Sequence, residues 1–170
     1  KEFFPLNEGE SVIAYIWANA VSCPRTGRLV PLLTDKWLRK PTTGKPERAV
    51  AVRLVTELGG EPLLEPVFEI VTGKDVDEAD ANAGYVSGGK GISPYDNLVI
   101  EADYIKTEAQ SGRMSQVLYA VAVKRPDGSR GFRNATAADR AALSRAAEEF
   151  ARVEERWIRD SVLPIEDVEF

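Results

Sequence analysis

The chain has 170 residues, of which 44% are hydrophobic and 29% charged, and its formal net charge is −5. This composition is typical of a globular chain with one well-filled core, and the acidic balance argues against a general polyanion-binding surface while permitting a local basic face. The chain contains no histidine, which removes the commonest general base, and its single cysteine excludes an internal disulfide and favours a reducing cytoplasm.

The chain begins without methionine and in mid-sequence, so we expect it to be a fragment of a larger protein. It has no signal-peptide pattern and no apolar run of bilayer length. We therefore expect a cytoplasmic protein without a membrane partner.

Alternation of apolar residues predicts strands in the first half of the chain. They cover residues 11–22, 29–33, 48–57 and 64–72. The first is apolar on both faces, as in a strand covered on both sides, and the last two form a hairpin. The acidic stretch 75–83 has small residues and no periodicity, which predicts an exposed loop.

The second half predicts a short helix over 102–111, strands over 116–124 and 130–133, and then a long helix. Thr136 is the expected N-cap of that last helix, with Asp139 in its first turn. Pro164 ends it. Four aromatic residues on apolar faces are expected in the core. They are Trp17, Phe68, Phe150 and Trp157.

These elements predict an α+β fold, with antiparallel strands around two ribbon-like hairpins and a long C-terminal amphipathic helix packed on one face. We expect a single domain over 1–170. Its parts are a first knuckle with strands (10–73), an acidic and glycine-rich loop (74–92), a second knuckle with strands (93–134) and the C-terminal helix (136–160).

A short pattern occurs twice, at residues 23–27 (Cys-Pro-Arg-Thr-Gly) and 93–97 (Ser-Pro-Tyr-Asp-Asn), each time before an apolar strand. In a zinc ribbon this turn, the knuckle, is Cys-Pro-x-Cys-Gly and supplies two thiolates to a tetrahedral metal site. Here the four ligand positions hold Cys23, Thr26, Ser93 and Asp96, and neutral hydroxyls are poor zinc ligands. We expect knuckles without metal, in which Thr26 and Asp96 bind backbone amides of their own turns.

Ordered blocks on both sides of these knuckles carry a resemblance to a known family. They are residues 14–24, 29–33, 37–38, 103–106, 112–114, 118–121 and 133–136. In this order they resemble the zinc-ribbon insert of adenine-specific DNA methylases, in a form that has lost the zinc ligands.

The resemblance implies a parent enzyme that transfers a methyl group from S-adenosylmethionine to the exocyclic amine of adenine. Such enzymes use a glycine-rich cofactor loop and an acidic-Pro-Pro-aromatic tetrapeptide that holds the flipped base. The nearest approach here, Ser93-Pro94-Tyr95, has one proline and lies inside the second knuckle. We therefore expect no catalytic, cofactor-binding or metal-binding residue in this chain, and S-adenosylmethionine bound elsewhere in the parent.

Three further patterns favour structural over chemical roles. Residues 84–91 match a phosphate-binding loop up to Lys90, but Gly91 replaces the required hydroxyl residue, so these glycines are expected to serve close packing. The acids of 75–80 lack the central glycine of a calcium loop. Asp103 and Glu108 could form an acid–base pair, but a helix cap and a surface acid are the simpler interpretation.

A basic stretch around one aromatic residue is the candidate nucleic-acid site. Lys and Arg side chains release counterions from phosphates, and an aromatic face can stack on an unpaired base. The candidate DNA-binding residues are Lys36, Trp37, Arg39, Lys40, Lys106 and Arg113, with Lys45 and Arg48 nearby. The alternative is a solvated charged surface with Trp37 as a buried cap on the sheet.

Two functions of different classes remain open. The first is a module of the methyltransferase that contacts or positions DNA and assists target recognition. The second is a structural or protein-interaction module that braces the methylase or docks a partner subunit of a restriction–modification or phage-defence system. The basic side chains should converge on one face in the first case and scatter in the second.

Overall fold

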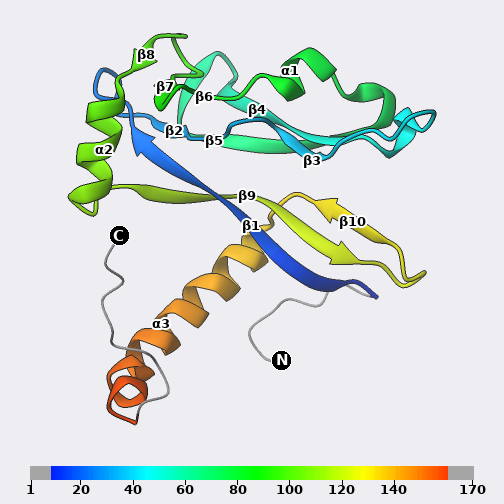
Figure 1. Ribbon diagram of the computed structural model, residues 1–170. Helices are drawn as coiled ribbons and strands as arrows, with labels where there is room; N and C mark the ends of the chain where they lie inside the picture. Colours follow the sequence, from blue (N-terminus) through cyan, green and yellow to red (C-terminus); the bar gives the residue numbers. More distant parts are fainter. Residues whose placement is uncertain (1–8, 161–170) are drawn as a thin grey trace. The chain divides into compact units, whose positions relative to one another are not determined.

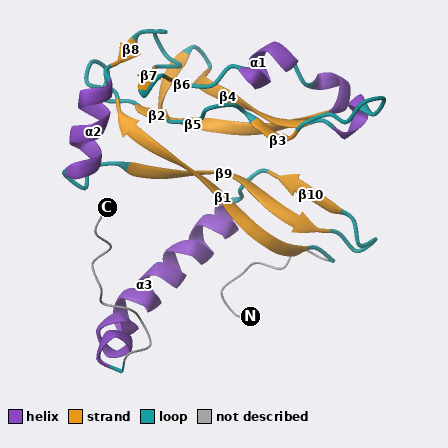
Figure 2. Cartoon of the chain, in the orientation of Figure 1, coloured by secondary structure: helices purple, strands orange, loops and turns teal. Residues whose placement is uncertain are grey.

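The computed structural model describes residues 9–160, apart from the side chain of Glu155, and divides them into two compact units (Figures 1 and 2). One unit is Glu10–Asn134 and contains all the strands. The described part of the other is Gly9 and residues 135–160, which contain helix α3. The α+β class expected from the sequence is confirmed.

The larger unit is built on a four-stranded antiparallel sheet with the order β10-β9-β1-β2. The strands are β1 (Ser11–Ser22), β2 (Leu29–Pro31), β9 (Ser115–Lys124) and β10 (Arg130–Arg133). The long β1 pairs with β9 along most of its length, and the register shifts between Val12 and Ala14 and between Ile16 and Trp17. Each of these strands was predicted, and the bounds of β1 are those expected.

A second sheet has the order β3-β4-β5. Its strands are β3 (Trp37–Arg39), β4 (Val50–Leu58) and β5 (Glu61–Thr72), with a 3-10 turn, η1 (Pro46–Arg48), before β4. The predicted hairpin of β4 and β5 closes at Gly59 and Gly60, whose φ values of 61° and 85° suit a two-residue turn. The hairpin prediction is therefore confirmed.

A third, small sheet carries the second knuckle and has the order β6-β7-β8. Its strands are β6 (Val86–Ser87), β7 (Lys90–Ile92) and β8 (Val99–Ile100), and α2 (Ala102–Gln110) follows them as predicted. The glycine-rich segment is thus a tight hairpin, turned at Gly88 and Gly89 with positive φ.

The prediction of an exposed loop over residues 75–83 was wrong in part. The chain forms a 3-10 turn, η2 (Gly73–Asp75), and a short helix, α1 (Glu78–Asn82). Asp77 caps α1 by accepting hydrogen bonds from the amides of Ala79 and Asp80, and Ala81 is buried. One capping side chain and one buried alanine organise a segment too short to show helical periodicity.

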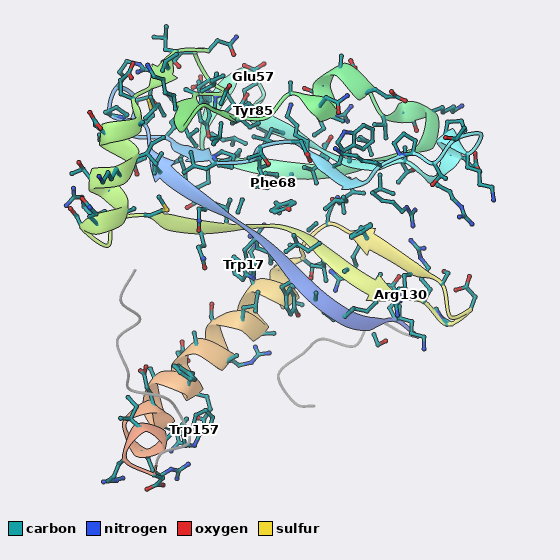
Figure 3. All side chains as sticks on the ribbon, in the orientation of Figure 1. Trp17, Glu57, Phe68, Tyr85, Arg130 and Trp157 are labelled. Atoms are coloured by element: carbon teal, nitrogen blue, oxygen red, sulfur yellow. The ribbon has the colours of Figure 1, made fainter. Side chains whose placement is uncertain are left out.

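The first two sheets face each other across the main core of the larger unit (Figure 1). The β1 and β9 side of this core supplies Ala18, Ala20 and Val117, and the β4 and β5 side supplies Val52 and Phe68. Phe68 lies between the sheets (Figure 3), and its ring centroid is 5.8 Å from that of Tyr119. Phe68 is therefore a core residue as predicted.

Trp17 was expected in the core, but 43% of its surface is exposed, because odd-numbered β1 residues at that level point away from the sheet pair.

Helix α3 (Ala137–Arg159) begins at a capping box. The Thr136 side chain accepts from the amide of Asp139, and the Asp139 carboxylate accepts from the amide of Thr136 at 2.8 Å, as the sequence predicted in outline. Phe150 and Trp157 contact each other edge to face at 6.0 Å, and Phe150 is exposed rather than part of a core. No helix within residues 9–160 is both long and apolar enough to cross a membrane.

Gly84 lies where the chain passes directly over the backbone of Leu33 and Thr34, and the amide of Tyr85 donates to the Leu33 carbonyl at 2.6 Å. A Cβ at Gly84 would overlap both carbonyl oxygens. At Gly131, by contrast, a Cβ would meet only the flexible end of the Arg125 side chain.

We expect Gly84→Ala to lower the free energy of unfolding by about 3 kcal/mol, because backbone atoms cannot move aside. Gly131→Ala is the matched control and should change it by less than about 1 kcal/mol, since an exposed arginine can rotate away. Urea denaturation of both variants measures the difference. Equal stability of the two variants would contradict the close packing at Gly84.

Candidate functional site

The first knuckle is a closed turn held by backbone hydrogen bonds. The amide of Cys23 donates to the carbonyl of Arg28 at 2.8 Å, and the amide of Gly27 donates to the carbonyl of Cys23 at 2.8 Å. Gly27 has a φ of 68°, the left-handed region that glycine adopts without strain.

The second knuckle repeats this pattern at the same spacings. The amide of Ser93 donates to the carbonyl of Leu98 at 3.0 Å, and the amide of Asn97 donates to the carbonyl of Ser93 at 2.9 Å. Asn97 takes the place of the glycine and has a φ of 54°, the only positive φ of a non-glycine residue in the described range. Asparagine tolerates this conformation better than most residues do. The two knuckles are therefore the same turn built from different residues.

The two residues at the second ligand position of each turn act as the sequence predicted. Thr26 Oγ1 accepts from the amide of Arg28 at 3.3 Å, and Asp96 Oδ1 accepts from the amide of Leu98 at 3.2 Å. Each side chain thus fixes its own turn through an i to i+2 hydrogen bond. This prediction is confirmed.

One arginine joins the two knuckles across 71 residues of sequence. Arg25 donates from Nε to Asp96 Oδ2 and from Nη2 to Asp96 Oδ1, both at 3.3 Å. Its Nη1 also donates to the carbonyl of Val99 at 3.1 Å. A guanidinium can satisfy two carboxylate oxygens at once, so Arg25 cross-links the turns in a defined orientation. Sequence analysis missed this link, because Arg25 occupies the variable position of the knuckle pattern.

A tyrosine makes the reciprocal connection. Tyr95 of the second knuckle donates from its hydroxyl to the carbonyl of Leu29 at 3.3 Å, and the Arg28 guanidinium lies 5.6 Å from its ring centroid. Beneath these contacts, Val21, Cys23, Val30 and Ile100 form a buried apolar cluster.

The charges at the knuckles shift the pKa values of two ligand-position residues. The Arg25 guanidinium, and then a hydrogen bond from Ser93, lower the pKa of Asp96 to about 2. Burial alone would raise the pKa of the Cys23 thiol, but hydrogen bonds from Thr26 and the turn backbone, with the nearby Arg25 charge, lower it overall. Asp96 is therefore ionised and forms an ion pair with Arg25.

These residues do not fit a structural zinc ion. The four positions offer one thiol, two hydroxyls and a carboxylate that binds Arg25, whereas structural zinc takes four thiolate or imidazole ligands. Within residues 9–160, no cluster of three or more His, Cys, Asp or Glu residues could hold a metal ion.

The candidate DNA-binding residues are not brought to one place. Lys36 is only 4% exposed, forms an ion pair with Asp80 and lies 4.8 Å from the ring centroid of Tyr85. Trp37 donates from Nε1 to Asn82 Oδ1 at 2.9 Å. Both side chains therefore help to attach α1 to the second sheet, and Trp37 is half-buried rather than the buried cap of the alternative.

Two of the candidates do lie together. Arg39 is exposed and donates from Nε to the carbonyl of Arg48 at 2.7 Å, and Lys40, next in the chain, lies 3.6 Å from Asp35. Arg39, Lys45 and Arg48 form no ion pair with any described residue. They make a small exposed basic cluster around β3 and η1.

The remaining two candidates lie at the opposite end of the larger unit, on and after α2 (Figure 1). Lys106 is exposed, and Arg113 is paired with Glu108 at 2.7 Å. Glu108 was expected to be a surface acid but is only 9% exposed, and its bond to Arg113 lowers its pKa. Asp103 lies in the first turn of α2, and Glu101 rather than Asp103 is the N-cap residue.

A shallow pocket of about 160 Å³ lies beside the paired knuckles. Its walls are Thr56, Glu57 and Pro62 from the β4–β5 hairpin, and Thr26, Arg28, Tyr95 and Asp96 from the knuckles. The sequence carries no local signal for this pocket, because its two sides are far apart along the chain.

No protein-family model, curated protein or solved structure is significantly similar to this chain.

We expect purified protein to carry no stoichiometric zinc and to keep its thermal midpoint in the presence of a chelator. The variant Thr26→Cys/Ser93→Cys/Asp96→Cys completes a four-cysteine set with Cys23 and should bind one zinc ion. Structural zinc stabilises small folds by roughly 10 kcal/mol, so chelation should then lower the midpoint sharply. Metal analysis and thermal melts are the measurements. Thr26→Cys alone is the control, and a zinc-free four-cysteine variant would contradict the resemblance of the paired knuckles to a zinc ribbon.

The Arg25–Asp96 bridge also predicts a pH dependence. The pKa of Asp96 is about 2 in the folded chain and 3.8 in an unperturbed carboxyl, so its stabilising effect is present above about pH 4 and is lost as the pH falls towards 2. Asp96→Asn retains the acceptor for the Leu98 amide but lacks the charge. Its stability should lie below wild type at pH 7 and converge with it near pH 2, in urea unfolding across this range. A constant difference at every pH would exclude a charge effect.

Proposed function

We propose that this chain is a non-catalytic, metal-free zinc-ribbon-like insert of an S-adenosylmethionine-dependent DNA adenine methyltransferase, and that it braces the parent enzyme or docks a partner subunit. The observation that carries this proposal is the paired knuckle. Two turns with matching backbone hydrogen bonds, 70 positions apart in the chain, are joined by the Arg25–Asp96 ion pair. This geometry supports the resemblance on which the assignment to a methyltransferase rests.

Several basic side chains already form ion pairs within the chain, which favours a bracing role over DNA contact. Lys36, Arg53, Lys90 and Arg113 pair with Asp80, Glu69, Glu101 and Glu108, respectively. A cation that is already neutralised by a carboxylate has less charge to offer to a phosphate. The candidates also scatter over opposite ends of the larger unit, which was the expected pattern for a structural or interaction module.

DNA contact remains a second candidate because of one observation. The exposed cluster of Arg39, Lys45 and Arg48, with Lys40 beside it, retains cations in one place. Such a cluster would add weak, salt-sensitive binding to the phosphate backbone without reading its sequence.

The test compares variants in the isolated chain and in the parent enzyme. The isolated chain should neither bind S-adenosylmethionine in calorimetry nor transfer a methyl group. In the parent, Gly84→Ala should lower both the thermal midpoint and the rate of DNA methylation, and Gly131→Ala is the control for a tolerated change.

A quadruple variant decides between the two candidates. Replacing Arg39, Lys40, Lys45 and Arg48 with alanine should leave the KM for DNA and its salt dependence unchanged if the module braces the enzyme. Under the second candidate the KM rises and the salt slope flattens by about one unit per lost phosphate contact. Methyl transfer by the isolated chain, or a parent enzyme indifferent to Gly84→Ala, would refute the proposal itself.

A further inference from the structure

The hairpin that joins β9 to β10 carries three cations without a carboxylate partner. Lys124, Arg125 and Arg130 are all exposed, and none of them forms an ion pair with any described residue (Figure 3). The one acid between them, Asp127, accepts from the amide of Ser129 at 2.8 Å and so helps to form the turn. In a chain whose net charge is −5, this hairpin is a local excess of positive charge.

Two of these cations stand directly opposite each other. The register of the two strands pairs Lys124 with Arg130. Side chains in such a pair lie on the same face of the sheet, and like charges there repel and destabilise the pairing. A bound polyanion would remove this repulsion, whereas in the free chain nothing described offsets it.

Arg125 lies on the other face of the hairpin. A Cβ on Gly131 would overlap the Arg125 guanidinium, so this group lies over the glycine. Gly131 is paired with the buried Val123, and alternation along the strands places this pair on the face opposite that of Lys124 and Arg130. The hairpin therefore presents cations on both faces.

The turn at the end of the hairpin is closed by its backbone. The amide of Arg125 donates to the carbonyl of Ser129 at 2.8 Å, and the amide of Gly128 donates to the carbonyl of Arg125 at 2.9 Å. Gly128 has a φ of 80°, which glycine adopts without strain. The backbone that carries the cations is thus fixed before any ligand binds, which reduces the entropy lost on binding.

The chemistry of this surface favours nucleic acid over a protein partner. Val123 is buried and Phe132 is half-buried, so the hairpin exposes no large apolar side chain. The centre of a protein–protein interface is apolar, whereas protein–DNA interfaces are polar and strongly positive. A two-stranded ribbon also fits the major groove of B-form DNA, and the corresponding groove of A-form RNA is too narrow for side chains to read.

We propose that the β9–β10 hairpin contacts duplex DNA, with Lys124, Arg125 and Arg130 bound to backbone phosphates and no base being read. The two phosphate strands that border a groove match cations on both faces of one ribbon. This site goes beyond the bracing role, which involves no nucleic acid, and it shares no residue with the exposed cluster of Arg39, Lys45 and Arg48.

The experiment titrates the full chain into a fluorescent, mixed-sequence DNA duplex of about twenty base pairs, or two helical turns, and measures anisotropy. Three phosphate contacts, each adding about 0.9 to the salt slope, should raise the Kd roughly fortyfold between about 50 and 200 mM salt. Lys124→Gln/Arg125→Gln/Arg130→Gln should lose most of this dependence. Arg125→Lys/Arg130→Lys keeps the charges and should retain it.

A second readout separates DNA contact from a structural role. Lys124→Glu turns the repulsive pair into an attractive one, so the thermal midpoint should rise by about 2 °C. The same variant should raise the Kd for the duplex about tenfold at about 50 mM salt, because one phosphate contact is lost. A side chain with only a structural role would not move stability and binding in opposite directions.

The matched control is Arg39→Ala/Lys45→Ala/Arg48→Ala, which removes three exposed cations elsewhere in the larger unit and should leave the Kd unchanged. Four outcomes would overturn the inference. They are the absence of salt-dependent binding, a triple glutamine variant that binds as wild type, equal weakening by the control, and tighter binding of an RNA duplex or a polyglutamate peptide than of DNA. Because this test involves only the chain and a duplex, its failure leaves the parent-enzyme test of bracing intact.

Discussion

The larger unit depends on how its two knuckle turns are held together. Arg25 bridges them through Asp96 and the carbonyl of Val99. Exposed ion pairs contribute little stability by themselves, so this bridge mainly sets orientation. The greater stabilisation comes from Val21, Val30 and Ile100 below it, because burying each aliphatic side chain contributes about 1.5 to 3 kcal/mol.

The same principle recurs at Lys36, where a cation also holds elements together. Burial alone would lower the pKa of this lysine, but the hydrogen bond to Asp80 and the contact with Tyr85 raise it, so the side chain stays charged inside the fold. Its backbone accepts from the amide of Val52 and donates to the carbonyl of Ala81. Some of the charged residues that suggested a binding surface in the sequence therefore form contacts within the fold instead.

Sequence patterns predicted what local chemistry determines. Alternation along β1, the turn residues of the knuckles and the capping box at Thr136 each act within a few residues, and the structure has these elements where expected. The prediction that Trp17 lies in the core was wrong, because the burial of its face of β1 depends on which elements cover that face. The Arg25–Asp96 link and the pocket were not predictable, since each joins residues far apart in sequence that only the folded topology brings together.

The burial of Cys23 has a consequence for the conditions under which the larger unit can remain folded. In a four-cysteine ribbon, oxidation of the thiolates or shortage of the metal removes the ligands that hold the knuckles, and the fold is lost with them. Here the single thiol is 1% exposed and packs among aliphatic side chains, and the other three positions cannot be oxidised. The hydrogen bonds and the Arg25–Asp96 ion pair that hold the two knuckles therefore contain no group that oxidation would alter.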